Sequence, residues 1–89
     1  MLQSFEHRSE PRTICEGDVR LYADGLSGEL MARLLDVSNN GFRAMHSSPD
    51  VTPGREFEFR HRFFVGRARV VWTRPYAGST QSGFQVLRG

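Results

Sequence analysis

Two short motifs hold the residue types and spacing that could recognise a nucleotide. The run Arg8-Ser9-Glu10-Pro11-Arg12 places two arginines four positions apart, in a segment that its proline keeps from forming a helix. The run Asp36-Val37-Ser38-Asn39-Asn40-Gly41 is a D-x-S-x-x-G pattern that ends in turn-forming residues. A guanidinium is a planar fork that matches a phosphate or the Hoogsteen edge of guanine, and a carboxylate accepts hydrogen bonds from the opposite edge. Alone, each motif also has a structural explanation, because arginine pairs recur by chance in this chain and Asp36 or Ser38 could bind local backbone amides.

The other chemistry-bearing residues form no catalytic or metal-binding pattern. Cys15 is the single cysteine, so an internal disulfide is excluded, and the three histidines are too scattered for a zinc site. Asp36, Ser38 and His46 match no nucleophile motif, and no glycine-rich loop precedes a helix. We therefore expect no metal, no cofactor and no enzymatic activity.

Period-two alternation of apolar and polar residues predicts that strands position the motifs. The clearest run is 55–60, where Phe57 and Phe59 share one face and charged residues share the other. Periodicity alone slightly favours a helix over residues 29–37, but the strands around them and the D-x-S-x-x-G motif at their end favour a strand. Strands are predicted over 13–22, 29–37, 42–46, 55–60, 63–74 and 83–87, which indicates a small antiparallel barrel or sandwich.

The same patterns predict the connections and one face of the core. Residues 38–41 should form a tight turn, because asparagine and glycine tolerate a positive φ. His61-Arg62 is the expected tip of a hairpin, and 76–82 is expected to be a loop rich in glycine, serine and threonine. Val70 and Trp72 fall on one face of their strand, so Trp72 is predicted to pack in the core.

Length and composition indicate one small globular domain. Of the 89 residues, 38% are hydrophobic and 25% are charged, as in ordinary globular domains. No apolar stretch approaches the ~20 residues of a membrane span, and no secretory signal is visible, so we expect a cytoplasmic protein without a membrane partner. All twelve basic residues are arginine, but the net charge of +2 argues against non-specific duplex binding as the main role.

The two motifs, in this order and followed by strands, resemble the PilZ domain, a bacterial receptor domain for cyclic di-GMP. The resemblance covers nearly the whole chain. It implies an all-β fold, a six-stranded antiparallel β-barrel of the split-barrel type, with residues 1–12 as a flexible arm and residues 13–89 as the barrel. Many members carry a helix after the last strand, which we expect this chain to lack. The resemblance rests on the two motifs and on Leu35–Phe42, Pro53-Gly54, Arg69–Trp72 and Gly83–Val86.

The resemblance also implies that cyclic di-GMP is held between the two motifs. Arg8 and Arg12 would contact its phosphates and the Hoogsteen edge of guanine. Asp36 would accept hydrogen bonds from a Watson–Crick edge, with Ser38 bonded to nearby polar atoms and Gly41 letting the backbone turn close to the ligand. Further contacts are candidates at His7, Asn39, Asn40 and Arg43.

The leading interpretation is a receptor or adaptor module that signals when its N-terminal arm closes onto the barrel over cyclic di-GMP. The output would pass to an unidentified protein effector, and a second copy of the chain is a further candidate partner. Two alternatives stay open. One is a PilZ-like interaction module that does not bind the nucleotide. The other, less favoured, is a binder of single-stranded nucleic acid that uses the arginines interleaved with Phe57, Phe59, Phe63 and Phe64.

Overall fold

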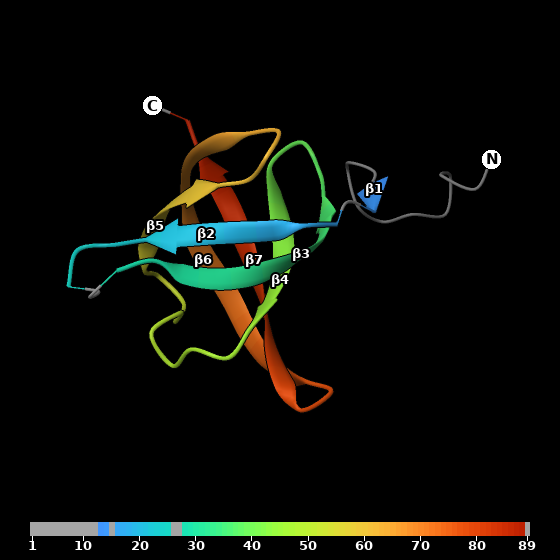
Figure 1. Ribbon diagram of the computed structural model, residues 1–89, viewed down its shortest axis with the longest axis vertical. Helices are drawn as coiled ribbons and strands as arrows, with labels where there is room; N and C mark the ends of the chain where they lie inside the picture. The colour runs from blue at the N-terminus through green and yellow to red at the C-terminus, as the bar shows by residue number, and fades with distance from the viewer. Residues whose placement is uncertain (1–12, 15, 26–27, 89) are drawn as a thin grey trace.

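The computed structural model describes residues 13–14, 16–25 and 28–88, and the regular structure in these residues consists of strands (Figure 1). No helix that could span a membrane occurs in this part of the chain. The prediction that residues 29–37 form a strand is confirmed by β3. The strands are β1 (Thr13–Ile14), β2 (Asp18–Tyr22), β3 (Leu30–Val37), β4 (Gly41–His46), β5 (Glu56–Arg60), β6 (Val65–Tyr76) and β7 (Ser79–Leu87).

Six of these strands close into an antiparallel barrel. They follow one another in the order β3-β2-β5-β6-β7-β4, and β4 pairs back with β3. The closure satisfies the backbone donors and acceptors that an open sheet would leave at its edges. The six-stranded antiparallel barrel expected from the sequence is therefore confirmed.

The predicted single strand over 13–22 is divided into β1 and β2, which pair with successive parts of one edge of β3. Thr13 lies opposite Val37, and Asp18 lies opposite Arg33. Between them, Gly17 adopts a φ of +124°, which residues with a side chain rarely adopt. Its carbonyl oxygen accepts a hydrogen bond from the Leu34 amide at 2.8 Å. The chain thus stays on β3 while the regular pairing is interrupted.

Apolar side chains from alternate positions of the six strands fill the barrel. Phe57 and Phe59 are buried, as their alternation predicts, and Phe42 stacks on Phe84 with a centroid distance of 4.7 Å. Phe64 also packs against this core. The interleaved phenylalanines are therefore mainly core residues, which contradicts a stacking surface for single-stranded nucleic acid. The buried hydrophobic residues are Val19, Leu21, Ala32, Leu34, Phe42, Ala44, Val51, Phe57, Phe59, Ala68, Val70 and Phe84.

The last hairpin corrects the prediction of a loop over 76–82. β6 continues to Tyr76, β7 begins at Ser79, and these two residues pair directly. Ala77 and Gly78 form the whole connection, with φ angles of 48° and 79°, the left-handed conformation of a two-residue type I′ turn. The long paired segment of β6 and β7 includes serine and threonine residues whose composition favours a loop, and the pairing makes them part of a strand. This hairpin extends beyond the barrel at the bottom of Figure 1.

Candidate ligand-binding site

The D-x-S-x-x-G motif spans the connection between β3 and β4. Asp36 lies in β3, and Gly41 is the first residue of β4. The backbone amide of Ser38 donates to the carbonyl oxygen of Gly41 at 2.8 Å, and the Ser38 hydroxyl donates to the same oxygen at 3.4 Å. Ser38 therefore holds the turn closed. The neighbouring Asn39 carbonyl accepts a hydrogen bond from Arg88, and the Asn40 carbonyl accepts one from an amide of β7.

Gly41 is required by a close approach between β4 and β7. A Cβ atom at this position would lie 2.0 Å from the carbonyl oxygen of Phe84, far inside van der Waals contact. None of Asn39, Asn40 and Gly41 has a positive φ, so the prediction that the turn needs these residues for a positive φ was wrong. Packing inside the barrel wall accounts for this residue without any ligand.

Two β-bulges turn Asp36 and Trp72 to the outer face of the barrel. In β3, the register shifts between Leu34 and Asp36, so that Leu34 lies opposite the buried Ala44 while Asp36 lies opposite Arg43. In β6, the register shifts between Val70 and Trp72. Each bulge inserts one residue, which reverses the alternation of side chains after it. The prediction that Trp72 packs in the core was wrong for this reason.

These shifts align four residues in one row across the outer face. Asp36 of β3 pairs with Arg43 of β4, Arg43 pairs with Gly83 of β7, and Gly83 pairs with Trp72 of β6. We call Asp36, Arg43, Gly83 and Trp72 the outer row. It brings a carboxylate, a guanidinium and an indole together from three of its four strands. The sequence singled out Asp36 and Arg43 but missed Trp72.

Asp36 and Arg43 form an ion pair in which the guanidinium covers the carboxylate. The Arg43 Nε lies 3.0 Å from both carboxylate oxygens, and its Nη2 also donates to Oδ2. The side chain of Asp36 is 8% exposed, whereas that of Arg43 is 36% exposed. The hydrogen bond to Asp36 raises the pKa of Arg43 above its ordinary value, against the opposing effect of burial. Arg43 is therefore a fixed cation on the surface, held by a buried anion.

The Trp72 indole lies against Gly83. A Cβ atom on Gly83 would lie 2.4 Å from Nε1 of the indole, so only glycine leaves room for the ring at this distance. The guanidinium carbon of Arg74 lies over the Trp72 ring, 4.4 Å from its centroid, in a cation–π contact. The aromatic surface is thus seated on the barrel wall and covered by one long side chain.

Two hollows border the outer row. One, of about 460 Å³, has Asp36, Arg43 and Tyr76 among its lining residues, together with Glu16, Arg33, Leu34, Leu35 and Gln81. The other, of about 290 Å³, has Trp72 in its wall, together with Ser38, Asn40, Gly41, Val71, Gly83, Phe84 and Gln85. The second motif is therefore divided between two neighbouring hollows.

Arg8 and Arg12 of the first motif lie outside the described residues, as does His7. The chain enters the described part at Thr13, which pairs with Val37, the residue between Asp36 and Ser38. The residue that follows Arg12 in the sequence is thus beside the second motif.

The comparisons with known proteins identify the family. A model of the PilZ domain matches residues 6–89. The chain belongs to the PilZ domain family. Its fold is similar to the PilZ domain with c-di-GMP of YcgR from Escherichia coli, with a TM-score of 0.76 and 16% identity, covering 93% of this chain and 79% of that one. It is also similar to the inhibitor of motility MotI/DgrA from Bacillus subtilis, with a TM-score of 0.76 and 14% identity, covering 93% of this chain and 44% of that one. No curated protein sequence matches at a significant level.

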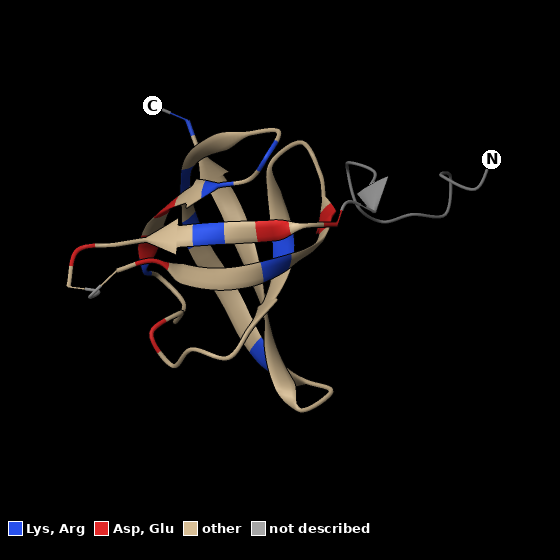
Figure 2. Ribbon diagram, in the orientation of Figure 1, with Lys and Arg blue, Asp and Glu red and all other residues tan. Residues whose placement is uncertain are grey.

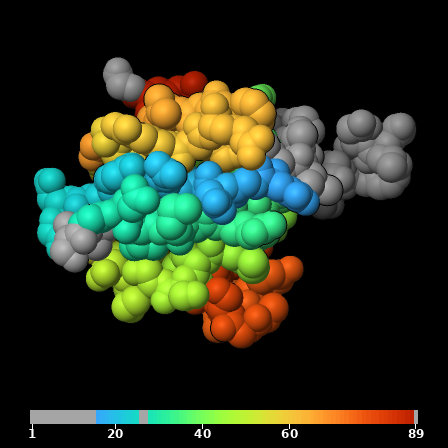
Figure 3. All heavy atoms as spheres, in the orientation of Figure 1, coloured from blue at the N-terminus to red at the C-terminus, as the bar shows by residue number. Residues whose placement is uncertain are grey.

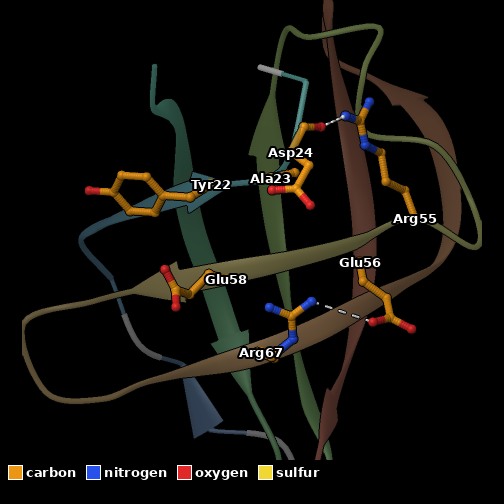
Figure 4. A pocket seen from close by; sticks show the side chains of 7 residues that line it. All are labelled: Tyr22, Ala23, Asp24, Arg55, Glu56, Glu58 and Arg67. Carbon is orange, nitrogen blue, oxygen red and sulfur yellow. Dashed lines mark hydrogen bonds and ion pairs between the residues drawn. The ribbon is translucent and has the colours of Figure 1, made fainter. Parts of the chain in front are cut away.

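This PilZ domain has another hollow, of about 530 Å³, between β2, β5 and β6 (Figure 4). Both arginines that line it have oxygen partners. Arg55 donates to the carbonyl oxygen of Asp24 at 3.0 Å, and Arg67 lies 3.6 Å from Glu56. No residue of the outer row lines this hollow, whereas all four line one of the two hollows described above, so this hollow is separate from the outer row.

A chain of hydrogen bonds links the buried His46 and Ser82 to Thr73 at the surface. His46 Nδ1 accepts from the amide of Ser48, so Nε2 of the neutral ring carries the proton and donates to Ser82 at 2.7 Å. Ser82 contacts the Thr73 hydroxyl at 2.8 Å. Burial lowers the pKa of His46 below 6.5. The histidine thus donates to the serine and does not act as its base. Within the described residues, no three potential ligands gather into a metal site.

Proposed function

We propose that this PilZ domain is a receptor module that binds cyclic di-GMP across the outer row. Family membership supports the proposal, as does the similarity to a PilZ domain with c-di-GMP. The observation that carries it is the gathering of a buried carboxylate, a fixed guanidinium and an indole beside the entry of the N-terminal segment. We further propose that the module binds without catalysing a reaction, in the bacterial cytoplasm, and passes its signal to a protein effector.

The Asp36–Arg43 pair supplies donors and acceptors that match guanine. A guanidinium fits the O6 and N7 acceptors of guanine, and a carboxylate accepts from its N1 and N2 donors. Arg43 already donates to both carboxylate oxygens of Asp36. A guanine therefore shares Asp36 with Arg43, or the Arg43 guanidinium turns toward the base. Adenine lacks the N1 and N2 donors, so the pair favours guanine.

Trp72 provides a surface on which a base can stack. A base stacked on an aromatic side chain gains about 1–3 kcal/mol. The indole is supported from below by Gly83, and Arg74 lies over it. A base that binds here replaces the Arg74 guanidinium or stacks beside it. A ligand with two guanines thus has a polar subsite at Asp36 and an aromatic subsite at Trp72.

We propose that residues 1–12 act as an arm whose Arg8 and Arg12 close over the bound nucleotide. From Arg8 to Thr13 the chain advances five residues, or at most about 18 Å when extended. Both arginines are thus tethered within reach of the hollow beside Asp36. Their guanidinium groups would balance the two phosphate charges of cyclic di-GMP.

Calorimetric titration of cyclic di-GMP into the wild type and Arg12→Ala tests this function. We expect the wild type to bind cyclic di-GMP in preference to cyclic di-AMP. Arg12→Ala should weaken binding about tenfold to a hundredfold, because a charge-assisted contact contributes about 1.5–3 kcal/mol. Arg67→Ala is the matched control, since Arg67 lines the separate hollow, and its affinity should equal that of the wild type.

Two outcomes would contradict the proposal. A wild type that does not respond to cyclic di-GMP would indicate an interaction module that does not bind the nucleotide. Equal losses in Arg12→Ala and Arg67→Ala would mean that arginines act only through the total charge of the chain. In that case the affinity would depend on salt concentration and not on position.

A further inference from the structure

The hairpin between β5 and β6 exposes two neighbouring apolar side chains. Phe63 is 73% exposed and Val65 is 69% exposed, whereas Phe57 and Phe59 of the same hairpin are buried. A solvated hairpin tip requires no apolar residue, and turn positions generally favour small polar residues. Exposed apolar residues that gather at one place mark a candidate contact surface when other features of that place support it.

The tip that carries Phe63 is held in one conformation. His61 and Phe64 exchange backbone hydrogen bonds of 2.8 and 3.3 Å, and the Phe63 amide donates to His61 Nδ1 at 3.2 Å. The His61 ring is buried, stacks on Phe64 at 4.5 Å, and its Nε2 lies 3.2 Å from the carbonyl oxygen of Glu16. Presenting Phe63 to a partner would therefore cost little ordering of the loop, which favours binding.

Arginines surround this tip on the outer surface. Arg20 of β2 pairs with Arg60 of β5, and Arg60 pairs with Val65 of β6. Arg62 lies over the Phe63 ring, 5.7 Å from its centroid. Figure 2 shows the basic positions of β2, β5 and the hairpin on one face, and Figure 3 shows that β2 and the hairpin form a continuous surface there.

The charges of these arginines are poorly neutralised. In the part of the chain that the structure describes, neither Arg60 nor Arg62 forms an ion pair, and Arg20 approaches Glu29 only at 3.7 Å. Arg60 instead lies over the Tyr22 ring at 5.4 Å. The arginines border a hollow of about 310 Å³, lined by Asp18, Arg20, Arg60, His61 and Arg62. A guanidinium-lined hollow is suited to a carboxylate.

We infer that this hairpin tip is a docking surface for a protein segment that combines an acidic side chain with an apolar one. The carboxylate would enter the hollow between Arg20, Arg60 and Arg62, while the apolar side chain would pack on Phe63 and Val65. Arginine and aromatic residues side by side are typical of the residues that dominate interface energies. We call Arg20, Arg60, Arg62, Phe63 and Val65 the hairpin patch.

Other anionic partners fit the hairpin patch less well. A single-stranded nucleic acid needs several aromatic faces for successive bases, and Phe63 is the one exposed ring among the four phenylalanines of this segment. A lipid bilayer would present many anionic groups, and Asp18 within the hollow would repel them. A peptide brings a single carboxylate, and the three arginines that line the hollow outweigh its repulsion by Asp18.

Selection of random peptides displayed on phage against the immobilised full chain tests this inference. The selection contains no nucleotide, so the inference about the hairpin patch can be refuted while the proposed nucleotide binding still stands. We expect the enriched peptides to pair Asp or Glu with an apolar residue, and their affinity to fall at least tenfold for Phe63→Ser and for Arg62→Glu. Val71→Ser is the matched control, because Val71 is 53% exposed in β6 outside the hairpin patch, and it should bind as the wild type does.

The variants change exposed side chains, so their thermal unfolding should match that of the wild type, and this is measured first. Amide chemical shifts of the wild type with one enriched peptide should change around the hairpin patch. The inference is overturned if no peptide is enriched, if enriched peptides lack acidic residues, or if Val71→Ser weakens binding as much as Phe63→Ser. It is also overturned if only phosphatidylglycerol vesicles or oligothymidine bind through these residues.

Discussion

Substituting Gly41 by alanine separates a packing role of this motif residue from a role in ligand binding. The added Cβ would lie 2.0 Å from the Phe84 carbonyl oxygen, whereas ordinary contact begins near 3.4 Å, so β4 and β7 must move apart by more than 1 Å. That movement disrupts the Gly41–Gln85 and Phe42–Phe84 pairs and the Phe42–Phe84 ring stack. Two or three hydrogen bonds of about 1 kcal/mol each and one aromatic pair give an expected loss of about 3–4 kcal/mol. Urea unfolding followed by Trp72 fluorescence measures the loss.

Gly78→Ala is the matched control for this experiment. Gly78 has a φ of +79°, and a Cβ atom added to it would meet no other atom within 4 Å, so alanine there introduces conformational strain without a clash. The expected cost is about 1–2 kcal/mol. If Gly41→Ala is no more destabilising than Gly78→Ala but loses cyclic di-GMP affinity, the packing explanation is refuted and the glycine serves the ligand.

Three further predictions concern the hydrogen bonds of His46, Ser82 and Thr73 and the indole of Trp72. The free energy of unfolding should fall as the pH drops below 6.5, because burial lowers the pKa of folded His46 and the unfolded chain therefore takes up the proton first. The loss should level off below the pKa of folded His46 and should largely disappear in His46→Gln. Urea midpoints at several pH values measure it. Ser82→Ala leaves His46 and Thr73 without their shared partner and should cost about 1–3 kcal/mol in the same assay. Gly83→Ala should displace the Trp72 indole, shift its fluorescence and weaken nucleotide binding, and an unchanged spectrum and affinity would contradict the stacking subsite.

The strands of the barrel were largely predictable because short-range alternation reports which side chains face the core. Residues 55–60 illustrate this, since Phe57 and Phe59 are buried and the glutamates beside them are exposed. The extent of β7 was not predictable in the same way. Its first residues have the composition of a loop, and pairing with the far end of β6 makes them a strand.

The outer row could be predicted only in part, because it depends on bulges. A bulge is fixed by the register between paired strands, and the bulged residues Leu35 and Val71 carry no local signal of their own. Alternation therefore assigned Trp72 to the core. The motif spacing singled out Asp36 as a candidate. That the Arg43 guanidinium covers the Asp36 carboxylate was not predictable, because it depends on the pairing of these two residues across the β3–β4 turn.

Because β1 and β2 are separate strands, β1 attaches the N-terminal segment to β3, whereas β2 takes part in closing the barrel. The ring of six strands is complete without β1, which adds only two residue pairs at the end of β3. Peeling β1 away would thus break few hydrogen bonds and leave every wall of the ring joined to its neighbours. Global unfolding measurements would register such a step weakly, whereas hydrogen exchange of the amides at Asp36 and Val37, which pair with β1, would report it. We therefore expect that β1 can detach from β3 while the barrel stays closed.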